Sequence, residues 1–440
     1  MFNAKLGKWL GMAPIPGKEP EVDALAMQHH VAVGETLLGE LPLKAERSIA
    51  QQDIADAIHR SNRAVRAAFL AVHVIWIYDE LTFQRKSSVR LRELSDMAAT
   101  MFPGLVPTYA QITQERLYIQ KDKEGREIDQ GIFFAAVMGN PECGTHLIES
   151  MLRPTALAVE LLPAFCRDGR IELSKVHIER SGDTAHVTIH NQACLNAEDD
   201  QLIADLETAV DLVLLDDKVR VASLRGGEMS HPKYAGRRVF SAGINLRELH
   251  RGRISFVDFL LGRELGYINK ILRGLIVDQT TIGFGIGKIE KPWIAAVDTF
   301  AIGGGAQLLL VFDKVIAGSN SYFSLPAAQE GIIPGVASLR LGRAVGARKA
   351  RQIILSGYKV EALHQDAQLL FDEVVAPCSV GEAIETSAAL LNGPAVVANR
   401  HMLTLAEEPI DLFRCYMAEF ALEQAYRMYS DDVLDKVARA

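Results

Sequence analysis

Segments with the pattern of β-strands alternate with segments with the pattern of α-helices from about residue 170 onward. This alternation restricts the folds that are open to the chain. The segment AHVTIHN (185–191) alternates like a half-buried strand, and residues 201–215 place apolar side chains at helical spacing. A further strand, VRVASL (219–224), precedes a helix expected over about 256–276, and KPWIAAV (291–297) favours another strand. This order predicts parallel strands joined by crossover helices, which is an α/β fold.

The sequence divides into three consecutive parts. Residues 1–170 are expected to form a helical N-terminal domain, because apolar residues recur on one face of segment 48–81, with Ser48 as the candidate N-cap. That face is expected to comprise Ile54, Ile58, Val65, Phe69, Val72 and Trp76. Residues 171–376 carry the alternation, and residues 377–440 form a second helical segment, which we expect to serve oligomerisation. The 440 residues provide enough chain for two or three domains.

The composition is that of a globular protein, with 49% hydrophobic and 23% charged residues. A net charge of -8 argues against a nucleic-acid partner, because phosphate contacts need a basic surface. The most apolar helical stretch is about half the ~20 residues that a membrane span needs, so we expect no membrane partner. The five cysteines are widely spaced, which favours a reducing, cytoplasmic location and offers no zinc motif.

Two glycine-containing segments carry the strongest signal for chemistry. VFSAGINL (239–246) and TFAIGGGAQLLLVFD (299–313) each place glycine where a strand ends and a helix begins. Glycine permits a positive φ and a close approach of the backbone to a ligand. Backbone N–H groups at such turns lack helical partners, so two of them can converge on one oxygen atom. The pair therefore predicts an oxyanion hole.

Five segments in order between about 180 and 375 resemble the enoyl-CoA hydratase/isomerase (crotonase) superfamily. They are HNQACLNAEDDQLIADLETAV, DDKVRVASLRG, VFSAGINL, KPWIAAVDTFAIGGGAQLLL and SYFSLPAAQEGIIPG. The resemblance implies a crotonase-like ββα-superhelix core that binds acyl-CoA thioesters. It also implies that the thioester oxygen is held by the N–H groups of Ile244 and Gly304, with Gly305 taking the second role if the register is off by one.

Two departures from the family pattern bear on the reaction. Hydratases of this family carry one glutamate after the glycine triplet and a second in the later segment, whereas this chain has Gln307 and Ala327. An amide cannot shuttle a proton as a carboxylate does, and alanine has no polar atom. Addition of water to an enoyl-CoA would lack both of its acid-base groups, which argues against a hydratase.

An oxyanion hole without a strong base suits a thioester whose α-carbon is already acidic, such as an arylacetyl-CoA. The long helical N-terminus and the missing glutamates resemble the dioxygenase branch of the superfamily that acts on (3,5-dihydroxyphenyl)acetyl-CoA. That resemblance implies oxidation by O2 to (3,5-dihydroxyphenyl)glyoxylate and free CoA, in the synthesis of a glycopeptide antibiotic precursor. It implies no metal, flavin, haem or other cofactor, and a homo-oligomer built from trimers.

The resemblance also implies roles for side chains around the oxyanion segments. Gln307, Glu198 and Arg263 are candidates to meet the two ring hydroxyls, although Glu198 and Arg263 also fit an ordinary surface pair. Leu246 and Ile333 are candidates for the wall of an apolar O2 pocket. The remaining candidates for substrate binding are Ala242, in the first oxyanion segment, and Arg225 and Arg238, near that segment. The two arginines are basic residues that would meet the CoA phosphates.

Four competing hypotheses stay open. A metal-dependent dioxygenase would need two histidines and a carboxylate, and His364, Asp366 and His401 are candidates. The segment around His364 has a helical pattern, in which residues two apart do not face each other. A nucleotide-binding oxidoreductase would use IGFGIGK (282–288), which we interpret as a helix end because it fails the phosphate-binding patterns. The third hypothesis is a crotonase-fold thioesterase or isomerase, and the fourth is a non-catalytic CoA-binding scaffold.

Overall fold

The computed structural model describes residues 2–277 and 287–439. Contacts between residues group the chain into two compact units. Unit 1 comprises residues 1–150, 250–257 and 414–440, and unit 2 comprises residues 151–249 and 258–413. This grouping differs from the three consecutive parts expected from the sequence, because both the N-terminal and the C-terminal part divide between the units. The three-part division stays a proposal about how the chain is organised.

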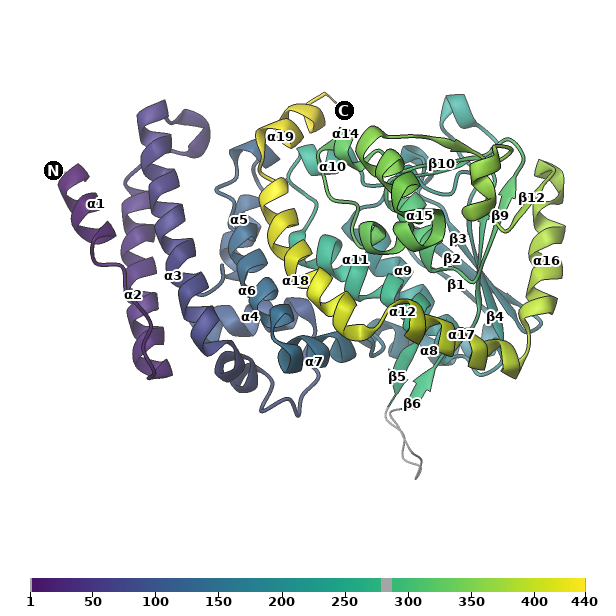
Figure 1. Ribbon diagram of the computed structural model, residues 1–440, viewed down its shortest axis with the longest axis horizontal. Helices are drawn as coiled ribbons and strands as arrows, with labels where there is room; N and C mark the ends of the chain where they lie inside the picture. Colours follow the sequence, from purple (N-terminus) through teal and green to yellow (C-terminus); the bar gives the residue numbers. More distant parts are fainter. Residues whose placement is uncertain (1, 278–286, 440) are drawn as a thin grey trace. The chain divides into compact units, whose positions relative to one another are not determined.

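Unit 1 is helical in the part of the chain that the structure describes. The α-helices that lie wholly or mostly in this unit are α1 (Phe2–Leu10), α2 (Pro20–Gly39), α3 (Ile49–Leu81), α4 (Leu91–Met101), α5 (Tyr109–Glu115), α6 (Glu127–Gly139), α7 (Pro141–Met151), α18 (Ile410–Arg427) and α19 (Asp431–Val437). Figure 1 shows the long helices α2 and α3 packed side by side. Short 3-10 turns cover Lys44–Glu46 and Gln120–Asp122.

The start of α3 is as the sequence predicts. The Ser48 side chain accepts a hydrogen bond from the Gln51 N–H, and the Gln51 side chain accepts one from the Ser48 N–H at 2.9 Å, which forms a capping box. Of the expected apolar face, Ile58, Val65 and Phe69 are buried and Ile54 and Trp76 are half-buried, but Val72 is 54% exposed and that part of the prediction is wrong. An α-helix turns by about 100° per residue, so residues spaced three or four apart do not stay at one angle around its axis. Along a long helix, some of these residues therefore turn away from the neighbouring helix.

Unit 2 is built on a seven-stranded sheet in the order β1-β2-β3-β4-β7-β9-β12. The strands β1, β2 and β3 pair antiparallel, and the strands from β3 to β12 pair parallel, as the sequence predicts. Their bounds are β1 (Arg170–Glu172), β2 (Val176–Ser181), β3 (Thr184–Ile189), β4 (Val221–Gly226), β7 (Trp293–Val297), β9 (Lys314–Gly318) and β12 (Glu373–Val375). Smaller sheets join β8 (Phe300–Ile302), β10 (Tyr322–Ser324) and β11 (Val360–Glu361), and β5 (Leu275–Val277) and β6 (Gly287–Ile289).

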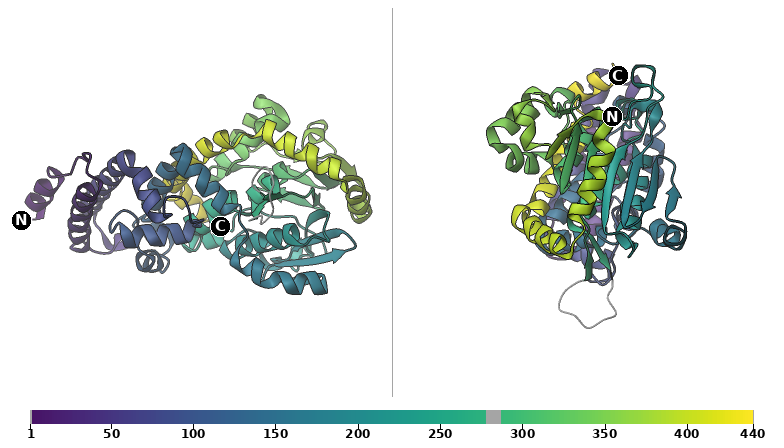
Figure 2. Two further views of the ribbon diagram at one scale, coloured as in Figure 1. Left: turned by 90° about the horizontal axis from the view of Figure 1, so that it is seen from below. Right: turned by 90° about the vertical axis from the view of Figure 1, so that its right-hand side faces the viewer.

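The helices of unit 2 include α8 (Ala156–Asp168), α9 (Asp200–Leu215), α10 (Leu246–His250), α13 (Gly304–Leu308), α14 (Ala327–Glu330), α15 (Ala337–Ser356), α16 (Val380–Leu391) and α17 (Pro394–Glu407). Of these, α8, α9 and α16 contact strands of the seven-stranded sheet. Helix α16 runs along the sheet in the right-hand view of Figure 2. Its Ile384 and Ala388 share one buried cluster with Ile294 of β7 and Ile316 of β9, which keeps that face of the sheet dry.

One prediction about local structure is wrong, and a second one concerns a segment that the structure describes only in part. The single helix expected over 256–276 consists of three pieces, a π-helical turn (Phe256–Leu261), α11 (Gly262–Leu265) and α12 (Tyr267–Arg273). Gly266, with φ -90° and ψ -113°, interrupts the helix. Of the glycine-rich segment 282–288, residues 282–286 lie outside the described residues, and Gly287 begins β6.

No helix within residues 2–277 and 287–439 is both long enough and apolar enough to cross a membrane.

Candidate active site

The first oxyanion segment is held by the backbone of Glu198. The Glu198 N–H donates to the Gly243 carbonyl at 2.7 Å, and the Asn245 N–H donates to the Glu198 carbonyl at 2.8 Å. Gly243 has a φ of +82°, which favours glycine at this turn. In a trans peptide the N–H points opposite to the preceding carbonyl, so the Ile244 N–H points away from Glu198. Among the described residues it has no hydrogen-bond acceptor.

The second oxyanion segment is the turn between β8 and α13. Gly303 has a φ of +53° and a ψ of -118°, a conformation that other residues rarely adopt. Its carbonyl accepts from the Gln307 N–H at 2.9 Å, which fixes the peptide between Gly303 and Gly304. The Gly304 N–H therefore points out of the start of the helix, and no acceptor for it lies within the described part of the chain.

The structure brings the two oxyanion segments side by side. Ser241 pairs with Ala301 in a parallel bridge, and the Ile302 N–H donates to the Ser241 carbonyl at 2.9 Å. The contact leaves no room for side chains, because a Cβ on Gly243 would lie 3.1 Å from the Gly304 nitrogen. Similarly, a Cβ on Gly305 would lie 2.6 Å from the Ser241 Cβ. The two segments are therefore adjacent, and the convergence of their N–H groups on one oxygen stays a prediction.

Glu198 and Arg263 form a buried ion pair, so the alternative of a surface pair is wrong. Their exposed fractions are 2% and 3%. The Arg263 Nε lies 2.8 Å from Glu198 Oε2, and its Nη2 lies 3.2 Å from Glu198 Oε1. The same Nη2 donates to the Gly304 carbonyl at 2.6 Å. Burial alone would lower the pKa of Arg263, but the carboxylates of Glu198 and Glu264 raise it, which keeps the guanidinium charged.

Glu264 connects Arg263 to Gln307, and it is a site residue that the sequence did not predict. Its Oε1 accepts from Arg263 Nη1 at 2.8 Å and also from Gln307 Nε2. Its Oε2 accepts from the Val336 N–H at 3.3 Å. Glu264 is 1% exposed, although glutamate is rarely buried. The available signal was its position next to Arg263 in a stretch with few other charges.

The ring of Tyr267 lies against the guanidinium of Arg263. The Arg263 guanidinium carbon is 5.9 Å from the centre of the Tyr267 ring, within the range of a cation–π contact. The Tyr267 hydroxyl is buried and has no hydrogen-bond partner among the described residues. Burial raises the pKa of this phenol well above its usual value, so it stays protonated.

The two candidates for an O2 pocket, Leu246 and Ile333, are both half-buried beside residues of this network. Leu246 directly follows Asn245, which Glu198 holds. The Ile333 carbonyl accepts from the Gly335 N–H at 2.9 Å, in the turn that precedes Val336. Leu246 therefore follows a residue that is bonded to Glu198, and Ile333 lies in the turn just before Val336, whose N–H donates to Glu264.

The basic candidates near the first oxyanion segment have protein partners. Arg225 forms a two-pronged ion pair with Asp298, with Nε to Oδ2 at 2.8 Å. Arg238 donates to the Gly226 carbonyl at 3.2 Å, but its side chain is 34% exposed. Of these two, Arg238 is better placed to reach a ligand. Ala242, the third candidate, is half-buried, and its N–H donates to the Leu195 carbonyl at 3.1 Å.

The histidines considered as metal ligands have separate partners. His364 and Asp366 are in contact, with the Asp366 N–H donating to His364 Nδ1 at 3.2 Å. The helix predicted here is wrong, since a 3-10 turn (Gln365–Leu369) lies between β11 and β12. His401 instead lies 2.7 Å from Glu290. Within the described residues, no group of three or more His, Cys, Asp or Glu side chains could hold a metal ion.

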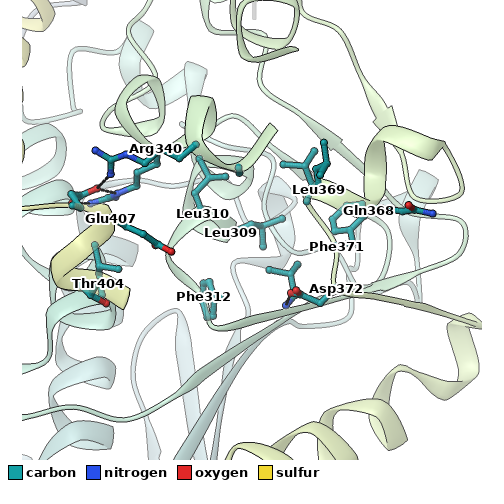
Figure 3. Close-up of a pocket in the computed structure, with 16 residues that line it drawn as sticks. Leu309, Leu310, Phe312, Arg340, Gln368, Leu369, Phe371, Asp372, Thr404 and Glu407 are labelled. Atoms are coloured by element: carbon teal, nitrogen blue, oxygen red, sulfur yellow. Dashed lines mark hydrogen bonds and ion pairs between the residues drawn. The ribbon is translucent and has the colours of Figure 1, made fainter. Parts of the chain in front are cut away.

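A separate cavity of about 530 Å³ lies elsewhere in unit 2 (Figure 3). Its wall includes Leu309, Phe312 and Phe371, and at one end Arg340 binds Glu408 through two hydrogen bonds of 2.9 and 3.0 Å. None of the predicted site residues lines this cavity. Its polar end anchors α17 to the core, since Glu408 also accepts from Arg273 at 2.9 Å.

The fold is that of the crotonase superfamily. The enoyl-CoA hydratase/isomerase family matches residues 283–407. A crystal structure of an enoyl-CoA hydratase from Mycobacterium avium subsp. paratuberculosis K-10 has a TM-score of 0.50 at 21% identity, covering 61% of this chain and 99% of that one. A probable enoyl-CoA hydratase from Rhizobium meliloti (strain 1021) is 32% identical over 256 residues, which cover 56% of this chain and 90% of that protein.

The chain belongs to the enoyl-CoA hydratase/isomerase family. Within that family it is 53% identical, over 425 residues and 97% of both chains, to the (3,5-dihydroxyphenyl)acetyl-CoA 1,2-dioxygenase of Amycolatopsis orientalis. The match to that protein extends over 97% of this chain, whereas the match to the hydratase extends over 56%. The crotonase-like core and the relationship to the dioxygenase branch, both expected from the sequence, are confirmed.

Proposed function

We propose that this chain is a dioxygenase that converts (3,5-dihydroxyphenyl)acetyl-CoA and O2 to (3,5-dihydroxyphenyl)glyoxylate and free CoA. The observation that carries the proposal is the 53% identity, along nearly the whole chain, to a protein of that name. Gln307 and Ala327 at the positions of the hydratase glutamates point away from water addition. The biological role that follows is the supply of a glycopeptide antibiotic precursor.

In the proposed mechanism the N–H groups of Ile244 and Gly304 bind the thioester oxygen. Removal of one α-proton leaves an enolate, whose negative charge these two N–H groups stabilise. The enolate transfers one electron to O2, and the two radicals combine to a peroxide at the α-carbon. The peroxide attacks the thioester carbonyl and expels CoA as the thiolate. Loss of the second α-proton with cleavage of the O–O bond gives the α-keto acid.

The aryl ring would be recognised by the buried network of Glu198, Arg263 and Gln307. Both hydroxyls of the substrate can donate and accept hydrogen bonds, and the network offers carboxylate, guanidinium and amide groups. Arg263 already binds Gly304, so the proposed recognition of the ring and the proposed oxyanion hole share one side chain. A ring bound at this network would place the thioester beside the oxyanion segments.

Further parts of the proposal are expectations from the family resemblance. Leu246 and Ile333 would line the site of O2, because neither side chain offers a polar atom. The enzyme would need no metal or organic cofactor. Arg238 and Ala242 would lie along the CoA part of the substrate, and Arg225 would support this region through Asp298. A homo-oligomer built from trimers and a cytoplasmic location remain predictions.

Oxygen uptake with product identification tests this function. The purified chain is mixed with (3,5-dihydroxyphenyl)acetyl-CoA at an oxygen electrode, and the products are identified by mass. We expect equal consumption of O2 and release of CoA, with activity that survives treatment with EDTA. Release of CoA without O2 uptake would instead support a thioesterase, and a shifted double bond an isomerase. Substrate binding without any conversion would support a scaffold.

A further inference from the structure

The contact between Glu264 and Gln307 fixes the direction of an amide. Gln307 Nε2 donates to Glu264 Oε1. An ionised carboxylate can only accept hydrogen bonds, whereas the amide has one donor end and one acceptor end. Rotating the amide by half a turn would bring two oxygen atoms together without a hydrogen between them. The carboxylate therefore dictates that Nε2 faces Glu264 and that Oε1 is the free end.

Glu264 is itself held in place, so it can impose this direction. Arg263 Nη1 binds its Oε1 at 2.8 Å, and the Val336 N–H binds its Oε2 at 3.3 Å. The backbone of Gly335 packs against the contact on a third side. A Cβ at Gly335 would lie 2.1 Å from Gln307 Nε2 and 2.2 Å from Glu264 Oε1. With both groups buried, neither has space to adopt another arrangement.

We propose that Glu264 is a positioning residue that presents the Gln307 Oε1, a pure hydrogen-bond acceptor, to the ring of the substrate. The site then selects a ring substituent that donates a hydrogen bond, as a phenolic hydroxyl does. A substituent of similar size without a donor, such as fluorine, leaves the Gln307 oxygen unpaired on binding. This inference rests on the proposed function, in which Gln307 meets a ring hydroxyl.

The same contact accounts for the amide at position 307. A glutamate there, as hydratases of the family have, would place two carboxylates in direct contact in a buried site. Like charges at such a distance cannot both be ionised near neutral pH, so the pair would share one proton. Glu264 and a glutamate at position 307 are thus incompatible unless that proton is bound. The amide donates to the Glu264 carboxylate without needing that proton.

The test measures binding without turnover, so that it does not depend on the dioxygenase reaction. Titration calorimetry under anaerobic conditions gives the Kd values of (3,5-dihydroxyphenyl)acetyl-CoA and (3,5-difluorophenyl)acetyl-CoA for the full-length chain. Their ratio is the readout. We expect the parent chain to prefer the dihydroxy ligand. Glu264→Met removes the acceptor at similar volume and frees the amide to rotate, which should reduce the preference about tenfold, the effect of one ordinary hydrogen bond.

Gln307→Met is the matched control, since it removes the amide and should give the same reduced ratio. Glu264→Met combined with Gln307→Met should then lower the preference no further than either change alone. An unchanged ratio in folded Glu264→Met would overturn the proposal. So would a parent chain that binds both ligands equally. A failure of the dioxygenase function would appear separately, as missing O2 uptake by a parent chain that still shows the preference.

Gln307→Glu provides a second test if Glu264→Met does not fold. With the shared proton bound, the introduced carboxyl group donates to Glu264 and still offers an oxygen to the ring. The ratio of the Kd values in the variant should therefore depend on pH, because loss of the shared proton breaks the contact with Glu264 and drives the two carboxylates apart. The parent chain is the control for this pH dependence, because the amide of Gln307 does not titrate. A pH-independent ratio in the variant would contradict the assigned contact.

Discussion

The guanidinium of Arg263 donates from Nη2 to the carbonyl oxygen of Gly304 at 2.6 Å. Gly304 supplies a backbone N–H to the proposed oxyanion hole, and Arg263 is also bound by the two buried carboxylates of Glu198 and Glu264. The group proposed to recognise the ring therefore also holds the backbone proposed to stabilise the enolate. A change at Arg263 should affect both steps, and the two effects can be separated by the choice of substrate.

Arg263→Lys tests this double role. Lysine keeps the positive charge but cannot bind Glu198 through two prongs and reach the Gly304 carbonyl as well. We expect kcat to fall about tenfold or more for both (3,5-dihydroxyphenyl)acetyl-CoA and phenylacetyl-CoA, through the loosened Gly304 peptide. KM should rise for the dihydroxy substrate only. Arg263→Ala should increase the difference in KM between the two substrates. It also leaves two buried carboxylates without their positively charged partner, which costs about 3–5 kcal/mol of stability.

Steady-state kinetics at an oxygen electrode measure both effects, with circular dichroism to confirm folding. Equal changes of KM for the two substrates would remove Arg263 from ring recognition. An unchanged kcat for phenylacetyl-CoA would mean that the Gly304 carbonyl needs no support from Arg263.

The glycine at position 304 should tolerate no side chain. A Cβ there would lie 2.3 Å from Glu198 Oε2 and 3.1 Å from Arg263 Nη2, so Gly304→Ala must displace the ion pair or the oxyanion backbone. We expect a loss of kcat of about 100-fold, the order seen when one oxyanion donor is removed. Gly342→Ala on α15 is the matched control, because no atom lies within 4 Å of its added methyl group. It should keep full activity and gain up to ~1 kcal/mol of stability.

Parent-like kcat in Gly304→Ala would contradict a catalytic role for this segment. A comparable loss in the Gly342→Ala control would show that the assay reports general instability and not the site.

The backbone part of the site could be predicted because glycine patterns report backbone geometry. A φ of +53° at Gly303 and of +82° at Gly243 require residues without a Cβ, and the sequence displays that requirement directly. The partners of buried charges could not be derived in this way. Glu264 has three hydrogen-bonding partners, and two of them come from distant parts of the chain. No local sequence pattern indicates that a glutamate is buried.

The fold shows the same division. Strand and helix periodicities located the parallel sheet and α9, whose Leu202, Leu206 and Val210 are all buried as expected. Periodicity did not reveal the break at Gly266, where a long apolar stretch divides into short helices. It also failed at 365–369, since a helical pattern is weaker than the tertiary contacts that fold this segment into a 3-10 turn.

Removal of the Tyr267 hydroxyl should not destabilise the chain. This hydroxyl is fully buried and makes no hydrogen bond of ordinary geometry in the described part of the chain, so little of its desolvation cost is recovered. Tyr267→Phe should therefore leave the free energy of unfolding unchanged or raise it by about 1 kcal/mol. Tyr78→Phe is the contrasting control, because the Tyr78 hydroxyl binds His146 Nδ1 at 2.8 Å and its loss should cost about 1 kcal/mol. A fall in kcat/KM of Tyr267→Phe confined to the dihydroxy substrate would instead show that the hydroxyl contacts the ring.

A buried glutamate in unit 1 should make stability depend on pH. Glu115 is 4% exposed; its Oε1 has no partner among the described residues, and its Oε2 accepts from the Arg126 N–H at 3.2 Å. Burial raises the pKa of Glu115 from 4.5 to about 7. Between these values the folded state binds more protons than the unfolded state, so this group lowers stability as the pH rises through that window.

Glu115→Gln should remove this dependence, because an amide stays neutral at every pH. At about pH 8 the variant is expected to exceed the parent chain by on the order of 2–3 kcal/mol, since each pKa unit corresponds to about 1.4 kcal/mol. Near pH 4.5 the difference should close, because the folded parent chain then carries the protonated, neutral acid. Urea denaturation at the two pH values measures both differences, with the exposed Glu93→Gln on α4 as the control for one lost charge. A variant with the same advantage at both pH values would show that Glu115 does not titrate in this window.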